Sequence, residues 1–224
     1  MRAVAFRYGE GAEVLHDIHL RLKAGCLALL IGPSGAGKTT LLHLAALRQA
    51  PVRGELYLFG REVARLAAEE RAALRRRIGL VPQDLRLVDH LSLFDNVALP
   101  LRIADWDEER LLAAASELLW WLGLGDLLEV PAAELSMGQR QLAAVARAVV
   151  HRPALLLADE PTSHLDRSRA ERVLTLFAEL AREGTAVLVA SHSREVLRRP
   201  EVELFEIDGG RLLHQEPLEL SPTG

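Results

Sequence analysis

The chain has 224 residues, half of them hydrophobic and 26% charged, with a formal net charge of −4 at pH 7. Apolar residues are plentiful along the whole chain, which excludes intrinsic disorder and is typical of a globular protein. The longest apolar runs are far shorter than the ~20 residues that a membrane-spanning helix needs. A net negative charge without a basic face argues against a dedicated nucleic-acid binder, so no nucleic-acid partner is expected.

The first residues lack the apolar segment of a signal peptide, so no secretory leader is expected. Cys26 is the only cysteine and cannot form a disulfide within the chain, which favours a cytoplasmic location. Lysine is also rare, because among the 27 basic residues only Lys23 and Lys38 are lysines. A chain that uses arginine at nearly every basic position has kept a lysine at position 38, which points to a specific role there.

Alternating apolar residues predict two strands near the N-terminus, one over Val4–Tyr8 and one over Ile18–Leu22. Cys26–Ile31 is a short continuous apolar run, as expected for a strand buried on both faces. A glycine-rich turn follows, and then a helix is predicted over 38–49. Further along, Glu55–Phe59 is typical of a strand.

The middle of the chain changes from alternating to helical spacing. Arg65–Arg77 predicts a charged amphipathic helix, and Ile78–Val81 predicts a strand that stops at Pro82. From about residue 84 to 150 the pattern is mostly helical. Two apolar stripes at helical spacing lie there: Leu111, Ala115, Leu118 and Leu122, then Leu142, Val145, Ala146 and Val149.

Alternation of strand and helix returns after this region. Leu155–Ala158 and Ala186–Ala190 are predicted strands on either side of a helix, and a hairpin turning at Asp208–Gly210 closes the pattern. The order of elements predicts an α/β fold with a mainly parallel sheet, interrupted by a helical insertion at about 86–152.

The turn between the buried strand and the first helix carries a phosphate-binding motif that matches G-x-x-x-x-G-K-[ST] in full and stands in the required context. Glycines let backbone N–H groups converge on phosphate oxygens, and the helix adds its positive N-terminal dipole. Lys38 is predicted to bind the β- and γ-phosphates and Thr39 to bind Mg²⁺. The motif consists of Gly32, Pro33, Ser34, Gly35, Ala36, Gly37, Lys38 and Thr39, with Thr40 next to it.

A second motif ends the strand Leu155–Ala158, where apolar residues lead into Asp159 and Glu160. The carboxyl edge of a buried strand is where ligands bind in open α/β sheets. Asp159 suits a role at Mg²⁺, and Glu160 is placed to polarise the water that attacks a γ-phosphate. Alone the motif is weak, because acidic residues often end strands at a surface; the phosphate-binding turn upstream makes it strong.

With these two motifs, four further elements make the sequence resemble the ATP-binding cassette (ABC) ATPases. Leu135-Ser136-Met137-Gly138-Gln139 resembles the family's LSGGQ signature, Gln83 matches the Q-loop, and Ser163-His164-Leu165-Asp166 resembles the D-loop. The fourth element is His192, which matches the switch histidine. In addition to these four, Tyr8 is similar to the aromatic residue that stacks on adenine. These elements occur in the family's order and cover essentially the whole chain.

The resemblance implies an ATPase whose ligands are ATP and Mg²⁺. It implies that Ser136, Gly138 and Gln139 begin a helix that faces the γ-phosphate held by a second copy of the chain. Gln83 would contact Mg²⁺ or the attacking water, and His192 would contact the γ-phosphate. Two copies would pack head to tail around two ATP molecules and separate after hydrolysis.

The resemblance also implies one ABC ATPase domain over 1–224. Residues 1–85 and 153–224 would form the P-loop core with an N-terminal antiparallel β subdomain, and about 86–152 the helical subdomain. Two positions depart from the family pattern: Met137 replaces the first signature glycine, and His164 stands where alanine is common. Hydrolysis is expected to survive both, at an altered rate.

Leu74–Asp84, Leu93–Leu101 and Pro153–Thr162 are similar to a subgroup that contains cell-division (FtsE), lipoprotein-release and macrolide-export ATPases. The short length and the stretch around Leu85–Leu101 favour the FtsE type, which implies an FtsX-type permease partner, a place on the inner face of the cell membrane and control of cell-wall hydrolysis. The apolar segment after Gln83 has two interpretations, as packing for the insertion or as an exposed groove for a partner helix.

Three alternatives are weaker. A soluble cassette acting on nucleic acid or ribosomes would need tandem cassettes, coiled coils or basic linkers. A scaffold that binds nucleotide without hydrolysis predicts loss of Glu160 or His192, and both are present. A P-loop kinase would not explain Gln83, Ser136 and His192 together.

Overall fold

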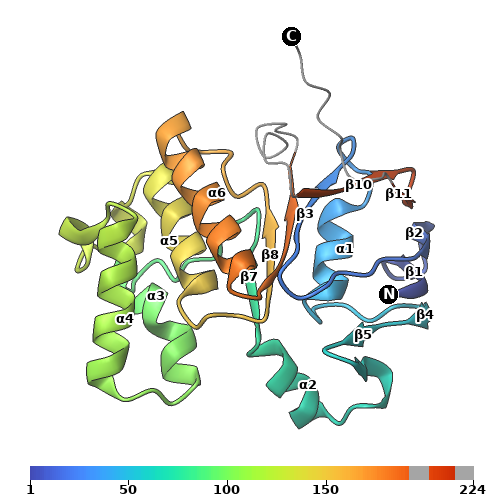
Figure 1. Cartoon of the computed structure of the whole chain (residues 1–224), viewed down its shortest axis with the longest axis horizontal. Coiled ribbons are helices and arrows are strands. Elements are labelled where there is room, and N and C mark those ends of the chain that lie inside the picture. Colours follow the sequence, from blue (N-terminus) through green and yellow to red (C-terminus); the bar gives the residue numbers. More distant parts are fainter. Residues whose placement is uncertain (192–201, 215–224) are drawn as a thin grey trace.

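A mainly parallel sheet forms the centre of the molecule (Figure 1). The computed structural model describes residues 1–191 and 202–214. Within these residues the central sheet has six strands in the order β11-β10-β3-β9-β8-β7, and only β11 runs antiparallel to its neighbour. In that order the strands are Arg211–His214, Val202–Asp208, Leu27–Ile31, Ala186–Ala190, Leu155–Asp159 and Ile78–Val81. This confirms the predicted α/β class and the closing hairpin.

The central strands are buried on both faces, as their continuous apolar sequences predict. In β3, Leu27 and Leu29 belong to a core shared with helices α3 to α6, whereas Ala28 and Leu30 belong to a core shared with α1 and the N-terminal strands. The same alternation runs through β8 and β9. Because side chains alternate across a sheet, this one layer holds both halves of the molecule together.

The N-terminal part folds into a separate antiparallel sheet, with strand order β2-β1-β4. Its strands are Glu13–Ile18, Arg2–Arg7 and Arg53–Glu55, and β5 (Tyr57–Leu58) pairs with β6 (Arg61–Glu62) beside it. The second strand therefore ends where the prediction had placed its start. The strand predicted over Glu55–Phe59 is divided at Leu56 into the end of β4 and the short β5, and β5 ends where Phe59 and Gly60, both with positive φ, turn the chain back.

Helices α3 (Leu93–Ile103), α4 (Glu108–Trp121) and α5 (Met137–Val149) form the helical region, with α6 (Arg167–Arg182) beside them (Figure 1). Both predicted stripes face the core, and of their members only Leu118 is not fully buried. Two helices are shorter than predicted. Helix α1 (Lys38–Ala45) ends just before Leu47 adopts a positive φ, and α2 (Ala68–Arg75) follows a 3₁₀ turn over Val63–Arg65.

The apolar segment after Gln83 packs inward. Leu85, Leu87, Leu93 and Phe94 are at most 9% exposed, which supports packing of the helical region rather than an exposed groove at these positions. Asn96, the only asparagine of the chain, is fully buried and fixes this segment. Its side chain accepts from the Val88 amide (2.7 Å) and donates to the Val88 carbonyl (3.0 Å).

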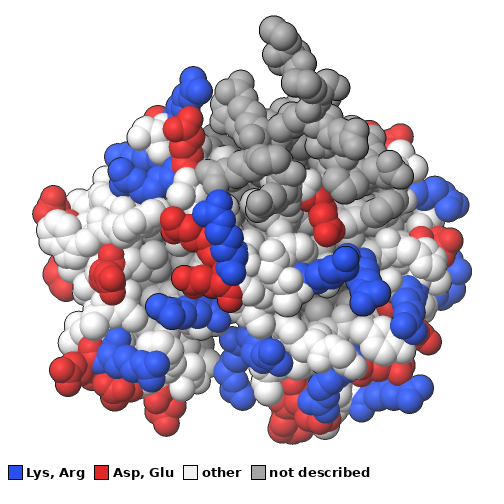
Figure 2. Space-filling view, viewed as in Figure 1, with Lys and Arg blue, Asp and Glu red and all other residues white. Residues whose placement is uncertain are grey.

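Acidic and basic side chains are interspersed over the face of the molecule that Figure 2 shows. Across residues 1–191 and 202–214, no helix combines the length and the apolarity that crossing a membrane would require.

Candidate functional site

The glycine-rich turn between β3 and α1 is held by close backbone packing. A Cβ atom at Gly32 would lie 2.1 Å from the Ile207 carbonyl oxygen, and one at Gly37 would lie 2.7 Å from Leu15 Cδ2. Gly37 also caps α1 in the left-handed region, with φ of 108°. Glycine is therefore required at both ends of the turn for the turn to fit against β2 and β10.

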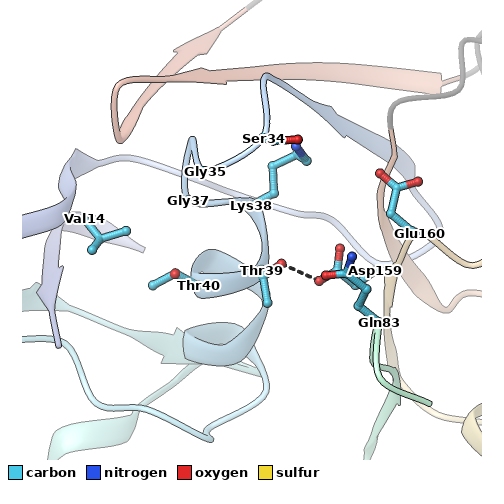
Figure 3. Close-up of a pocket in the computed structure, with 10 residues that line it drawn as sticks. All are labelled: Val14, Ser34, Gly35, Gly37, Lys38, Thr39, Thr40, Gln83, Asp159 and Glu160. Atoms are coloured by element: carbon cyan, nitrogen blue, oxygen red, sulfur yellow. Dashed lines mark hydrogen bonds between the residues drawn. The ribbon is translucent and has the colours of Figure 1, made fainter.

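Lys38 is buried, and its ammonium lies against the turn itself. Nζ donates hydrogen bonds to the carbonyl oxygens of Gly32 (2.8 Å) and Pro33 (3.1 Å). In Figure 3 the side chain points along the turn toward Ser34. The cation thus stands where the turn and the N-terminus of α1 meet, which is the arrangement expected for holding phosphate oxygens.

Thr39 and Asp159 are brought together from positions 120 residues apart. Thr39 Oγ1 donates a 2.6 Å hydrogen bond to Asp159 Oδ2, and Asp159 is only 4% exposed. Gln83 follows β7, whose neighbour β8 delivers Asp159, so the two side chains lie beside each other at one edge of the sheet (Figure 3). The structure therefore assembles three predicted cation ligands in one place.

A pocket of about 250 Å³ lies between these groups. It is lined by Val14, Ser34, Gly35, Gly37, Lys38, Thr39, Thr40, Gln83, Asp159 and Glu160. Nine of these residues were predicted from the sequence. Val14 was missed, because nothing in its local pattern separates it from other strand residues.

Glu160 occupies a strained backbone position at the pocket. Its φ is +48°, a conformation that costs a non-glycine residue about 1–3 kcal/mol. Its amide donates to the Ala190 carbonyl (2.8 Å), and its Oε2 accepts from Ser191 Oγ (3.1 Å). Ser191 is buried and was not predicted, although it directly precedes His192. His192 itself lies outside the described residues.

Tyr8 lies beside this pocket rather than in its lining. Its hydroxyl is hydrogen-bonded to Thr40 Oγ1 (3.0 Å), and its ring meets Phe6 edge to face at 4.8 Å. The Tyr8 side chain is nevertheless half exposed. The residue is therefore anchored next to the phosphate-binding turn and keeps an accessible ring.

The signature segment lies at the start of α5. Ser136 and Gln139 form a reciprocal cap, in which Ser136 Oγ accepts from the Gln139 amide and Gln139 Oε1 accepts from the Ser136 amide. Met137 is 51% exposed, so its bulk is directed to the surface. Ser136, Met137, Gly138 and Gln139 do not line the pocket of their own chain. The structure therefore does not bring the predicted signature residues and the phosphate-binding turn together within one copy.

His164 connects α5 to the turn that carries Glu160. Its Nδ1 lies 3.2 Å from Gln141 Oε1 and 3.0 Å from Ser163 Oγ, and Ser163 Oγ donates to the Glu160 carbonyl (3.1 Å). Gln141 is 1% exposed, and its Nε2 has no partner among the described residues. The sequence showed His164 only as a departure from the family pattern and gave no sign of this connection.

The sequence model of the family described as ABC transporter matches residues 15–163. This match covers more than half of the chain and contains the phosphate-binding turn, the signature segment and both carboxylates. The chain belongs to the ABC transporter family. It is an ABC ATPase, since the family match and the structural neighbour described next both identify an ATP-hydrolysing cassette.

Three relatives show similar identity. The Escherichia coli K12 cell division ATP-binding protein FtsE is 37% identical over 209 residues, covering 93% of this chain and 94% of that protein. The Novosphingobium aromaticivorans lipoprotein-releasing system ATP-binding protein LolD is 39% identical, covering 85% and 86%. The Mesorhizobium japonicum methionine import ATP-binding protein MetN is 40% identical over 95% of this chain, which spans only 58% of MetN.

The structural comparison agrees with the family. A dimeric structure of a post-hydrolysis state of the ATP-binding cassette MJ0796, bound to ADP and Pi, superimposes with a TM-score of 0.89 at 31% identity, over 97% of each chain. Identity to the cell-division, lipoprotein-release and methionine-import relatives spans only 37–40%, so identity does not separate these branches.

Proposed function

We propose that this chain is the Mg²⁺-dependent ATPase of an FtsE-type complex. In this proposal two copies enclose ATP and drive conformational change in an FtsX-type permease that regulates cell-wall hydrolysis. The observation that carries the ATPase role is the convergence of Lys38, Thr39, Asp159 and Glu160 on one pocket. The assignment to the FtsE branch of the family rests on the match to FtsE, which covers 94% of that protein.

The donor set fits Mg²⁺. Thr39, Gln83 and Asp159 offer hydroxyl, amide and carboxylate oxygens, and Mg²⁺ binds through oxygens with one or two carboxylates plus substrate phosphates. Among the described residues, no group of three His, Cys, Asp or Glu side chains is placed to hold a metal ion. The proposed Mg²⁺ site is therefore completed by the phosphates of the nucleotide and not by protein ligands alone. When bound, Mg²⁺ would neutralise charge on the β- and γ-phosphates.

The protein's own groups have distinct roles in this proposal. The turn and Lys38 bind the phosphates, while Glu160 accepts a proton from the attacking water. Ser191 holds the Glu160 carboxylate through its 3.1 Å hydrogen bond, so the base is oriented before ATP binds. His192 is proposed to contact the γ-phosphate, and Tyr8 to stack on adenine.

The dimer follows from the position of the signature segment. The N-terminus of α5 is a capped, exposed turn that does not line the pocket of its own chain, which supports a dimer in which this turn faces the phosphate bound by a second copy. The MJ0796 cassette with the same fold is dimeric.

We further propose that residues 1–85 and 153–224 form the nucleotide-binding core and that about 86–152 form the helical subdomain. The complex is proposed to lie on the inner face of the membrane.

A lipoprotein-release or macrolide-export role is the second candidate, favoured by the 39% identity to LolD over 86% of that protein. Identification of the untagged membrane protein that co-purifies with this chain tests the branch. An FtsX-type permease supports the cell-division role, whereas a lipoprotein-release permease contradicts it.

Glu160→Gln tests the ATPase and the dimer together. The variant should lose at least about 100-fold in turnover, because the amide cannot take a proton from water. It should also accumulate as an ATP-bound dimer in size-exclusion chromatography, while wild type with ATP and Mg²⁺ returns to monomer. Wild-type turnover in the variant would contradict the assignment of Glu160 as the base.

A further inference from the structure

A second cavity, of about 360 Å³, lies on the helical side of the molecule and shares no residue with the nucleotide pocket. Helices α4 and α6 form its walls, and the C-terminal end of α5 forms its floor. The two walls are joined at one end, where Arg172 Nη1 donates to the Trp121 carbonyl (3.3 Å). We call this cavity the α4–α6 groove; Figure 1 shows the three helices on the same side of the sheet.

The floor of the α4–α6 groove is apolar. Val149 and Leu180 are buried, and the half-buried Leu118 and Leu176 pack against the same core. Trp121 closes one end with 42% of its side chain exposed. Apolar surface therefore continues from the core into an open groove, where it can be covered by another apolar side chain.

The rim of the groove is acidic on both walls. Glu117 stands on α4, and Glu179 and Glu183 stand on α6, all three exposed. Within residues 1–191 and 202–214 none of these carboxylates forms an ion pair or a hydrogen bond. Arg152 is the one basic residue in the lining, and its guanidinium forms no ion pair or hydrogen bond with the described residues either.

Helix dipoles strengthen this negative charge. Helices α5 and α6 both end at the groove, since Val149 and Glu183 line it together. The C-terminus of a helix carries a partial negative charge, so carboxylates there are unfavourable. Glu179 and Glu183 thus weaken the helix they belong to, and a bound cationic group would offset that cost.

We propose that the α4–α6 groove binds a basic amphipathic helix of a protein partner. An apolar stripe would cover the floor beside Trp121, and Lys or Arg side chains on its flanks would pair with Glu117, Glu179 and Glu183. This site is separate from the segment after Gln83, where the sequence first suggested partner contact, and it does not depend on which branch of the family the chain serves.

Charge decides against two other occupants. Anionic lipid headgroups would be repelled by the acidic rim. The chain's own C-terminal residues 215–224 contain Glu216 and Glu219 and no lysine or arginine, so they carry the same sign as the rim. The groove therefore favours a basic segment from a different protein.

The probe is a synthetic helical peptide of leucine and lysine with one apolar stripe, compared with its leucine–glutamate counterpart. Isothermal titration calorimetry at physiological salt should show binding of the lysine peptide only. Glu179→Lys combined with Glu183→Lys should weaken that binding about tenfold or more, since it removes two ion pairs and adds repulsion. Trp121→Ser should weaken it by removing apolar contact, and hydrogen exchange should show protection confined to α4 and α6.

Glu10→Lys combined with Glu129→Lys is the matched control. Both glutamates are exposed, lie outside the groove and form no ion pair in the part of the chain that the structure describes. The control should bind the lysine peptide as wild type does. Equal weakening in control and groove variants, or equal binding of the glutamate peptide, would overturn the proposal. A change in the oligomeric state of the groove variants would assign the groove to a second copy and also overturn it.

Discussion

The phosphate-binding turn and the start of α5 are built in opposite ways. The turn is locked between β2 and β10, where Gly32 and Gly37 leave no room for a side chain, and Lys38 is buried against it. The start of α5 is fixed by a local cap between Ser136 and Gln139 and remains accessible. The phosphate-binding part of the proposed site is thus assembled within a single copy, and the start of α5 is an accessible surface that a partner copy would use in the proposed dimer.

The largest effect of a substitution is expected at the phosphate-binding turn. Lys38→Ala removes a buried cation that is the one basic side chain among the described residues lining the pocket, and ATP turnover should fall about 100- to 1,000-fold. Steady-state phosphate release with saturating Mg²⁺ measures this. Retention of most of the turnover would show that the turn alone supplies the phosphate site.

Gly37→Ala should destabilise the turn itself. The substitution places a Cβ 2.7 Å from Leu15 Cδ2 and forces alanine into φ of 108°, so the free energy of unfolding should fall by about 2 kcal/mol or more. Urea unfolding measures the change. Gly35→Ala is the matched control, because Gly35 also has positive φ but a Cβ there meets nothing within 4 Å. If both variants lose the same stability, close packing is not what fixes the turn.

Ser136→Ala tests the exposed half and should have a smaller effect. Loss of the cap should lower the free energy of unfolding by about 1 kcal/mol, without a change in ATP binding to the monomer. Ser136→Thr keeps a hydroxyl and should restore most of the stability. A loss of monomer ATP affinity in Ser136→Ala would contradict the separation of the two halves.

The smallest expected effect is on how the free energy of unfolding depends on pH, and it involves residues outside both the phosphate-binding turn and the start of α5. Burial lowers the pKa of His151, outweighing the opposing effect of the Ile78 backbone, and burial also lowers the pKa of His43. The unfolded chain therefore takes up protons near pH 6.5 that the folded chain resists, so the free energy of unfolding should decrease as pH falls from 7.5 to about 5.5. His151→Gln should flatten this dependence in urea titrations at each pH. An unchanged slope would exclude His151 as its source.

Local sequence carried enough information for the elements and for most of the pocket. The continuous apolar runs of β3, β8 and β9 specify strands buried on both faces, and their carboxyl edge must collect Asp159 and Glu160. The missed features depend on contacts between distant segments. Ser191 reaches Glu160 across 31 positions and His164 reaches Gln141 across 23, and neither pairing leaves a periodic or spacing signal.

Element ends were missed for a related reason. Strand β5 ends before Phe59 and helix α1 ends before Leu47, and both residues have a positive φ that their residue types rarely adopt. Sequence propensities give no warning there, because the surrounding packing imposes the turn. Local sequence also could not decide whether the apolar side chains after Gln83 are exposed, because their burial depends on the helices that cover them.

The hydrogen bonds of Glu160 have a consequence for how turnover can be controlled. Its amide is tied to Ala190 and its carboxylate to Ser191, so the residue after β8 is clamped to the end of β9. Withdrawing Glu160, the proposed base, would break at least these two bonds between adjacent strands and would disturb the sheet beneath them. A gate that works by moving Glu160 is therefore disfavoured, and in the proposed dimer the rate would more readily be set by how often a second copy arrives.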